Sequence, residues 1–168
     1  MAVQIKTLTD QLKQHNYAGV LQTIVCVPEA EKTDALKLLE LVARLKADPN
    51  SPMINHYMNE SSGWVYEQPD QLLSERAFIH LLHQESSPAI RLYQQLGEEN
   101  FTAVDFNRYG NAHLINHDFD QALRCYDRAI ELEPDEPSHR NNKGGALARL
   151  QRFDLALEVY DECLELDP

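Results

Sequence analysis

The sequence predicts an all-α fold in which pairs of helices repeat along the chain. Residues 103–134 and 137–168 align without a gap at a spacing of 34 residues and are identical at 12 of 32 positions. A period of this length corresponds to one helix-turn-helix unit. The first segment closes at Glu133-Pro134, where a residue that precedes proline is pushed out of the α region. Each segment is therefore expected to hold two helices joined by a turn.

The first helix of each segment is expected over residues 105–116 and 138–150. Both carry glycine and alanine near the middle, where glycine costs about 1 kcal/mol relative to alanine. That cost suggests that a neighbouring helix approaches closely. The small residues are Gly110 and Ala112 in the first segment and Gly144 and Ala146 in the second.

The second helix of each segment is expected over residues 119–132 and 153–166. Spacings of four and three residues place a small, a large and a small side chain on one stripe of each helix. Such a stripe lets a neighbouring helix nest against it. The stripe residues are Ala122, Tyr126 and Ala129 in the first segment and Ala156, Tyr160 and Cys163 in the second.

This arrangement of small residues, aromatic residue and closing proline over 34 residues resembles the tetratricopeptide repeat. The resemblance implies a right-handed α-solenoid. One repeat cannot bury its apolar face alone, so further repeats are expected upstream of the two clear ones, 103–136 and 137–168. In this family the first helix of each repeat lines the concave groove and the second faces outward.

Residues 70–102 resemble a degenerate repeat that keeps the spacing of both helices. The residues that carry this pattern are Leu73, Ala77 and His80 in the first helix and Ala89, Tyr93 and Leu96 in the second. Residues 1–69 are expected to form an N-terminal helical region. It includes an amphipathic helix over 29–47 and an irregular segment over 48–69 that contains Trp64.

The composition excludes several classes of function. A net charge of −12 argues against a nucleic-acid partner, which calls for a basic stripe. No apolar run approaches the ~18 residues that a membrane span needs. Three cysteines without a secretory signal favour reduced thiols and a cytoplasmic location.

The two helices of the last repeat differ in charge. Residues 138–150 contain three bases and no acid, whereas residues 153–168 contain six acids and no base. The resemblance therefore implies a groove less negative than its back. Arg140 and Lys143 stand where the family places large apolar side chains, which puts the packing of this helix in doubt and suggests a terminal repeat.

The repeat register selects six candidate residues for a partner-binding groove: Asn107, Arg108, Asn111, Asn141, Asn142 and Arg149. Asparagine offers donors and an acceptor, which suits the backbone of an extended peptide. In family members that clamp a C-terminal carboxylate, asparagines stand at the positions of Asn111 and Asn142. Asn107 occupies the first basic position of that clamp, so the match is partial. The alternative is that these asparagines are solvated or cap local backbone.

Two histidines could bind a metal ion from one side of a helix, but their positions in the repeat have a simpler explanation. His113 and His117 are four residues apart, as metal ligands on a helix can be. In the repeat register, however, His113 takes a position usually filled by a packed aromatic residue, and His117 falls in the turn. His80 and His83 are interpreted in the same way. No phosphate-binding loop or nucleophile signature is visible, so we expect no enzyme, no metal and no cofactor, unless distant side chains assemble a site.

The favoured function is protein–protein interaction, in which the concave groove binds a peptide segment or helix of a partner. No polar capping helix is expected over Leu155, Val159 and Leu166, which leaves three alternatives. The chain is a fragment of a longer repeat array, two copies cover each other's ends as a homodimer, or the last helix is polar enough alone. A further alternative function is that of a small acidic chaperone for a secreted or aggregation-prone client.

Overall fold

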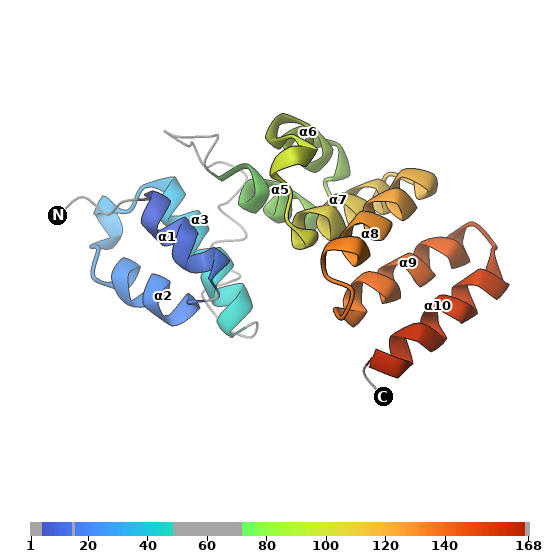
Figure 1. The fold of residues 1–168 in the computed structure, drawn as a ribbon. Coiled ribbons are helices and arrows are strands. Elements are labelled where there is room, and N and C mark those ends of the chain that lie inside the picture. The colour runs from blue at the N-terminus through green and yellow to red at the C-terminus, as the bar shows by residue number, and fades with distance from the viewer. Residues whose placement is uncertain (1–4, 15, 49–71, 167–168) are drawn as a thin grey trace. The chain divides into compact units, whose positions relative to one another are not determined.

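The computed structural model describes residues 5–14, 16–48 and 72–166, and every regular element in these ranges is helical (Figure 1). The predicted all-α helical-repeat fold is confirmed. The described residues belong to two compact units, Met1–Ile79 and His80–Pro168. Trp64 and most of the predicted irregular segment lie outside the described residues.

The first unit contains α1 (Ile5–Lys13), α2 (Tyr17–Val25) and α3 (Asp34–Ala47). The predicted helix over 29–47 is shorter than expected. Residues 29–31 form a single 3₁₀ turn, and α3 begins only at Asp34 because the Thr33 side chain accepts a hydrogen bond from the backbone N–H of Leu36.

The helix α3 forms the centre of the first core. The helix is covered on nearly all sides, because Leu36, Leu41 and Ala43 are buried in addition to its apolar stripe. The stripe expected from the periodicity is Ala35, Leu38, Leu39 and Val42, which are buried, and Leu45, which is half-buried. Glu40 is buried among them. Its carboxylate accepts hydrogen bonds from Lys32 Nζ at 2.7 Å and from Arg44 Nη2 at 2.6 Å, which satisfies a charge that would otherwise be costly to bury.

The helix α5 (Leu73–Leu82) crosses the boundary between the two units. The described part of the second unit continues with five α-helices, which are α6 (Ser86–Leu96), α7 (Ala103–Ile115), α8 (Phe119–Leu132), α9 (Pro137–Arg149) and α10 (Phe153–Leu166), and a 3₁₀ turn at Glu98–Asn100 lies between α6 and α7. The predicted bounds of α8 and α10 are confirmed at both ends. The division into a degenerate repeat at 70–102 and two complete repeats stays a prediction.

Local signals fix the starts of the first helices slightly earlier than predicted. Thr102 and Asp105 form a capping box, in which each side chain accepts a hydrogen bond from the backbone N–H of the other residue. This box starts α7 at Ala103. In α9, Pro137 occupies the first helical turn, where its missing N–H costs nothing.

One turn geometry joins the helices of three successive pairs. His117, between α7 and α8, has a φ of 61°, in the left-handed region. The N–H of His117 donates to the carbonyl of Leu114, and the N–H of Asp118 donates to the carbonyl of His113. This pattern is the Schellman motif. Gln84 (φ 62°) and Gln151 (φ 59°) occupy the same place in the α5–α6 and α9–α10 turns.

The close helix approach predicted from the mid-helix glycines is confirmed. A β-carbon added to Gly110 would lie 2.6 Å from Cε1 of Tyr126, and one added to Gly144 would lie 2.5 Å from Cε1 of Tyr160. Both distances are too short for a real contact. Each glycine therefore lets a tyrosine ring of the second helix lie against the backbone of the first.

Candidate functional site

A side-chain hydrogen bond joins the first helices of the last two helix pairs. Asn142 Nδ2 on α9 donates to Asn107 Oδ1 on α7 across 2.9 Å. Both side chains are half-buried. Asn111 lies one helical turn after Asn107 and therefore shares its side of α7. We call these three residues, Asn107, Asn111 and Asn142, the asparagine face.

The amide of Asn111 is held in place by the core. Its Oδ1 accepts a hydrogen bond of 2.7 Å from the hydroxyl of Tyr126 on α8. Tyr126 is fully buried, and burial raises the pKa of its hydroxyl, which therefore remains a protonated donor. Asn111 thus satisfies a buried polar group and at the same time presents its Nδ2 donor with a fixed orientation.

The other three candidate residues are placed differently. Asn141 is exposed and is turned from Asn142 by about 100° around α9. Arg149 is exposed two turns after Asn142 on α9, and Arg108 is half-buried on α7. The structure therefore brings three of the six predicted residues together, while the binding role of all six stays a prediction.

His113 is packed as the repeat register predicts. Its ring lies edge-on to that of Tyr109 with a centroid distance of 4.5 Å, and burial lowers its pKa, which favours the neutral imidazole. His117 lies in the left-handed turn position. Among the residues that the structure describes, no group of three or more His, Cys, Asp or Glu side chains is placed to hold a metal ion.

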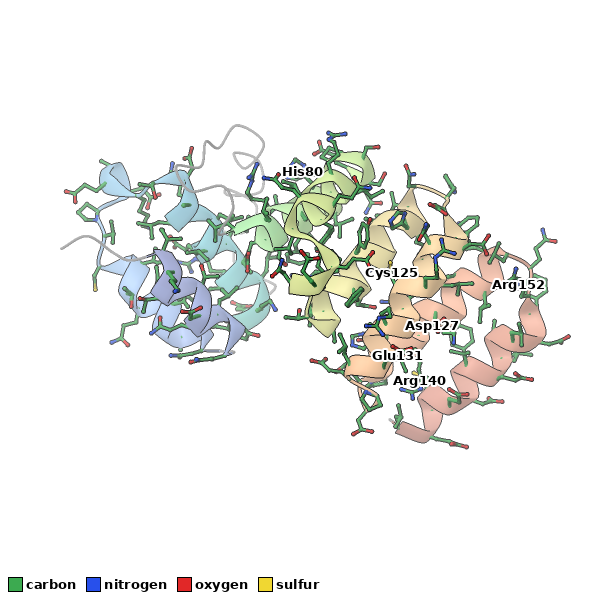
Figure 2. The ribbon with its side chains drawn as sticks, turned by 45° about the horizontal axis from the view of Figure 1, so that its top comes forward. His80, Cys125, Asp127, Glu131, Arg140 and Arg152 are labelled. Carbon is green, nitrogen blue, oxygen red and sulfur yellow. The ribbon has the colours of Figure 1, made fainter. Side chains whose placement is uncertain are left out.

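The two unexpected cations of α9 reach the acids of neighbouring second helices. Lys143 Nζ lies 2.8 Å from Asp127 Oδ1 on α8, and Arg140 Nε lies 3.4 Å from Glu162 Oε2 on α10. Figure 2 labels Asp127 on α8 and Arg140 on α9. Both cations are partly covered, as expected when a long apolar stem packs and the charged head turns outward. Arg140 and Lys143 therefore connect α9 to the second helices, and they are not part of the asparagine face.

The two cysteines of the second unit are Cys125 and Cys163. Cys125 on α8 is buried, and this burial raises the pKa of its thiol to about 12, so that the thiolate is scarce near neutral pH. Cys163 donates to the backbone carbonyl of Pro137. Over the described ranges, no helix combines the length and the apolar character that crossing a membrane requires.

The exposed apolar surface of α10 differs from the one expected. Val159 is buried against Leu147 and Ala156, because α9 covers that side of the helix. Leu155 and Leu166 are exposed as expected. Three more exposed residues, Phe153, Leu157 and Leu164, were not singled out from the sequence. The sequence does offer a signal for them, because the residues 34 positions earlier on α8 are also large and apolar.

The family model described as tetratricopeptide repeat matches residues 109–168, which contain most of α7 and all of α8, α9 and α10. Over these residues the chain matches the tetratricopeptide repeat. A stretch of 57 residues is also 32% identical to the protein STIP1 homolog of Dictyostelium discoideum. That match covers 34% of this chain, which spans only 10% of the length of that relative.

Solved structures show the same fold at low sequence identity. MamA AMB-1 has a TM-score of 0.65 at 18% identity, and the alignment covers 98% of both chains. MamA 41-end from Desulfovibrio magneticus RS-1 has a TM-score of 0.62 at 11% identity, with 99% of this chain and 97% of that chain covered. The APC/C hetero-tetramer Cut9-Hcn1 contains a chain with a TM-score of 0.61 at 16% identity, covering 95% of this chain and 30% of that one.

Tetratricopeptide repeats stack into extended surfaces that other proteins bind. The match of residues 109–168 to this repeat supports an interaction surface of this kind in the second unit.

Proposed function

We propose that the repeats bind a peptide segment or helix of a partner protein along the asparagine face of α7 and α9. The observation that carries this proposal is the hydrogen bond between Asn142 and Asn107, which holds two half-buried amides in register across consecutive first helices. Positioned amides lose little conformational freedom when they bind a ligand, so such a surface is better prepared than a flexible one.

The internal hydrogen bonds decide which atoms remain for a partner. Asn107 Oδ1 and Asn142 Nδ2 are used by each other, which leaves the Nδ2 donors of Asn107 and the Oδ1 acceptor of Asn142. Asn111 uses its Oδ1 for Tyr126 and keeps its Nδ2 donors. Donors and an acceptor in one row match the carbonyl and N–H groups of an extended backbone, which need partners when they are desolvated.

The charge of the first helices favours acidic residues in the partner. Arg149 is exposed on the side of α9 that carries Asn142, and Arg108 lies on α7 next to Asn107. The helix α9 contains no acidic residue, while the acids of this region gather on the second helices. Such charges steer association and select partners more than they increase affinity, so we expect modest affinity at this single surface.

The proposal includes no catalytic step and no cofactor. A cytoplasmic location and the absence of nucleic acid among the partners stay predictions from composition. The homodimer and the chaperone alternatives also stay predictions.

The test is a binding experiment with selected peptides. Peptides displayed on phage are selected on the full chain, and the dissociation constant of the best peptide is measured for the wild type and for the variant Asn111→Asp/Asn142→Asp. The new carboxylates replace donors with acceptors and repel acidic residues, so we expect binding to weaken by about 10- to 30-fold, equivalent to two lost hydrogen bonds. The carboxylate that Asn111→Asp introduces can still accept the hydrogen bond from the Tyr126 hydroxyl, so folding is expected to persist.

The matched control is Gln22→Glu/Gln121→Glu, which makes the same amide-to-carboxylate change at two exposed positions outside the asparagine face. It should bind the peptide as the wild type does. Equal binding by all three proteins would place the peptide on another surface and refute the proposal.

A further inference from the structure

An exposed apolar stripe runs along the last helix of the repeats. Phe153, Leu157 and Leu164 have exposed fractions of 60%, 61% and 62%. At 3.6 residues per turn they lie within about 40° of each other around α10. We call these three residues the α10 stripe. Exposed apolar rows of this kind usually mark a surface that another element covers.

The same stripe on α8 shows what fits there. The equivalents of the α10 stripe, 34 residues earlier, are Phe119, Leu123 and Ile130, and all three are half-buried. Leu123 packs against the two buried clusters to which α9 contributes Ala146 and Leu147. At Leu123, therefore, α8 packs into a core that includes α9, whereas the equivalent Leu157 of α10 is exposed.

The helices α8 and α10 also carry an acidic residue at the same place beside these apolar residues. Asp127 lies on the flank of the α8 stripe and pairs with Lys143 of α9 at 2.8 Å. Its equivalent beside the α10 stripe is Asp161, which is exposed. The helix α10 contains five acids and no base between Phe153 and Leu166. The bare surface therefore repeats both the apolar seam and the acidic flank that hold α9 on α8.

The first helices repeat the polar part of this interface. Asn107 on α7 accepts a hydrogen bond from Asn142 of the following helix pair. Its equivalent on α9 is Asn141, which is exposed. A helix docked on α10 as α9 docks on α8 would bring a residue to Asn141 as well. The α10 stripe, Asp161 and Asn141 together define how a docked helix would be aligned along α10.

We propose that the α10 stripe binds a basic helix of a partner protein in the place that α9 takes on α8. The helix carries small residues along the contact and a lysine or arginine opposite Asp161. A second copy of the chain fits poorly, because pairing two α10 helices brings together ten carboxylates without a base, and its own α9 is already packed between α8 and α10. This surface is distinct from the asparagine face.

The probe is a synthetic peptide with the sequence of residues 137–150, in which a hydrocarbon staple links positions 141 and 145 to keep the peptide helical. It carries a fluorescent label, and its binding to the full chain is followed by anisotropy. We expect saturable binding that Leu157→Asp weakens at least tenfold. The matched control, Leu155→Asp, changes an exposed leucine on the other flank of α10 and should leave binding unchanged.

A charge swap tests the register independently of the stripe. Asp161→Lys in the chain should weaken binding of the peptide about fivefold, and Lys143→Glu in the peptide should restore it. Absence of saturable binding, equal weakening by Leu155→Asp and Leu157→Asp, or a charge swap without rescue would each overturn the proposal. A chain that dimerises with rising concentration, and becomes monomeric with Leu157→Asp, would show that a second copy occupies the stripe instead.

Discussion

The absent β-carbon of Gly110 decides how closely α7 and α8 approach. The ring of Tyr126 lies over this glycine, and its hydroxyl donates to Asn111, so one tyrosine connects the core to the asparagine face. The sequence predicted the close approach because glycine is costly in mid-helix. It could not predict the bond to Asn111, since the alignment of these positions depends on how the two helices pack.

Replacing Gly110 with alanine tests this contact. Tyr126 is fully buried and has no room to withdraw, so Gly110→Ala should lower the free energy of unfolding by about 1–3 kcal/mol. Gly145→Ala is the control, because its β-carbon would lie 3.9 Å from the Tyr160 hydroxyl. There, helix propensity should stabilise the protein by up to about 1 kcal/mol. Urea unfolding of both variants measures the difference, and changes of the same sign would contradict the packing described.

His113 makes stability depend on pH. Burial lowers its pKa in the folded protein below the ordinary value of 6.5, so the unfolded chain binds the proton more readily. Its contribution to stability is therefore complete above about pH 6.5 and is lost as the pH falls through the lowered pKa. His113→Phe should fold with the ring still packed and lose less stability than the wild type between pH 7 and pH 5. Thermal melts at both pH values measure this, and parallel losses in the two proteins would exclude His113 as the cause.

At the scale of the elements, the turn between paired helices is the feature that recurs. Gln84, His117 and Gln151 all adopt a positive φ at the position where glycine or asparagine is usual. A side chain in this conformation costs about 1–2 kcal/mol, partly offset by the greater freedom that glycine gives the unfolded chain. The sequence therefore carries some strain in each of these turns.

Glycine in one of these turns should relieve that strain. Gln151→Gly is expected to raise the free energy of unfolding by about 0.5–1 kcal/mol. Gln22→Gly, at an exposed position inside α2, should lower it by about 1 kcal/mol, because there glycine only loses helix propensity. Chemical denaturation distinguishes the two signs. A destabilised Gln151→Gly variant would mean that the glutamine side chain makes a contact that outweighs its backbone strain.

The helices with periodic apolar residues were predicted best. The bounds of α8 and α10 follow from their stripes and closing residues. The start of α3 was placed too early, because the acids at 29–31 fit a helix, whereas the Thr33 cap sets the first turn. Short polar contacts of this kind compete with propensity over a few residues and are hard to weigh without coordinates.

At the scale of the whole molecule, the candidate site was predicted in part. The repeat register grouped six residues on the first helices, but it could not show that Asn107 and Asn142, 35 residues apart, bond to each other. The register also left the packing of the helix with Arg140 and Lys143 in doubt. The structure shows that both side chains reach acids on neighbouring second helices. Contacts between repeats depend on the rotation from one repeat to the next, which a single sequence does not encode at the level of one side chain.

The distribution of charge separates two kinds of partner. The asparagine face lies on first helices with arginines nearby, and we expect it to select acidic segments. The α10 stripe is bordered by carboxylates, and we expect it to select a basic helix. We therefore expect the second unit to offer two surfaces of opposite charge preference, as an adaptor that holds two proteins requires.

A partner segment that binds along the asparagine face should perturb the three side-chain amides that form it. The most direct test records the side-chain amide resonances of the full chain by NMR while the phage-selected peptide is added. We expect the side-chain NH₂ signals of Asn107, Asn111 and Asn142 to shift saturably, while those of asparagines elsewhere, such as Asn16, stay in place. Saturable shifts confined to α10 or to the first unit, with these three signals unmoved, would show that the peptide binds another surface.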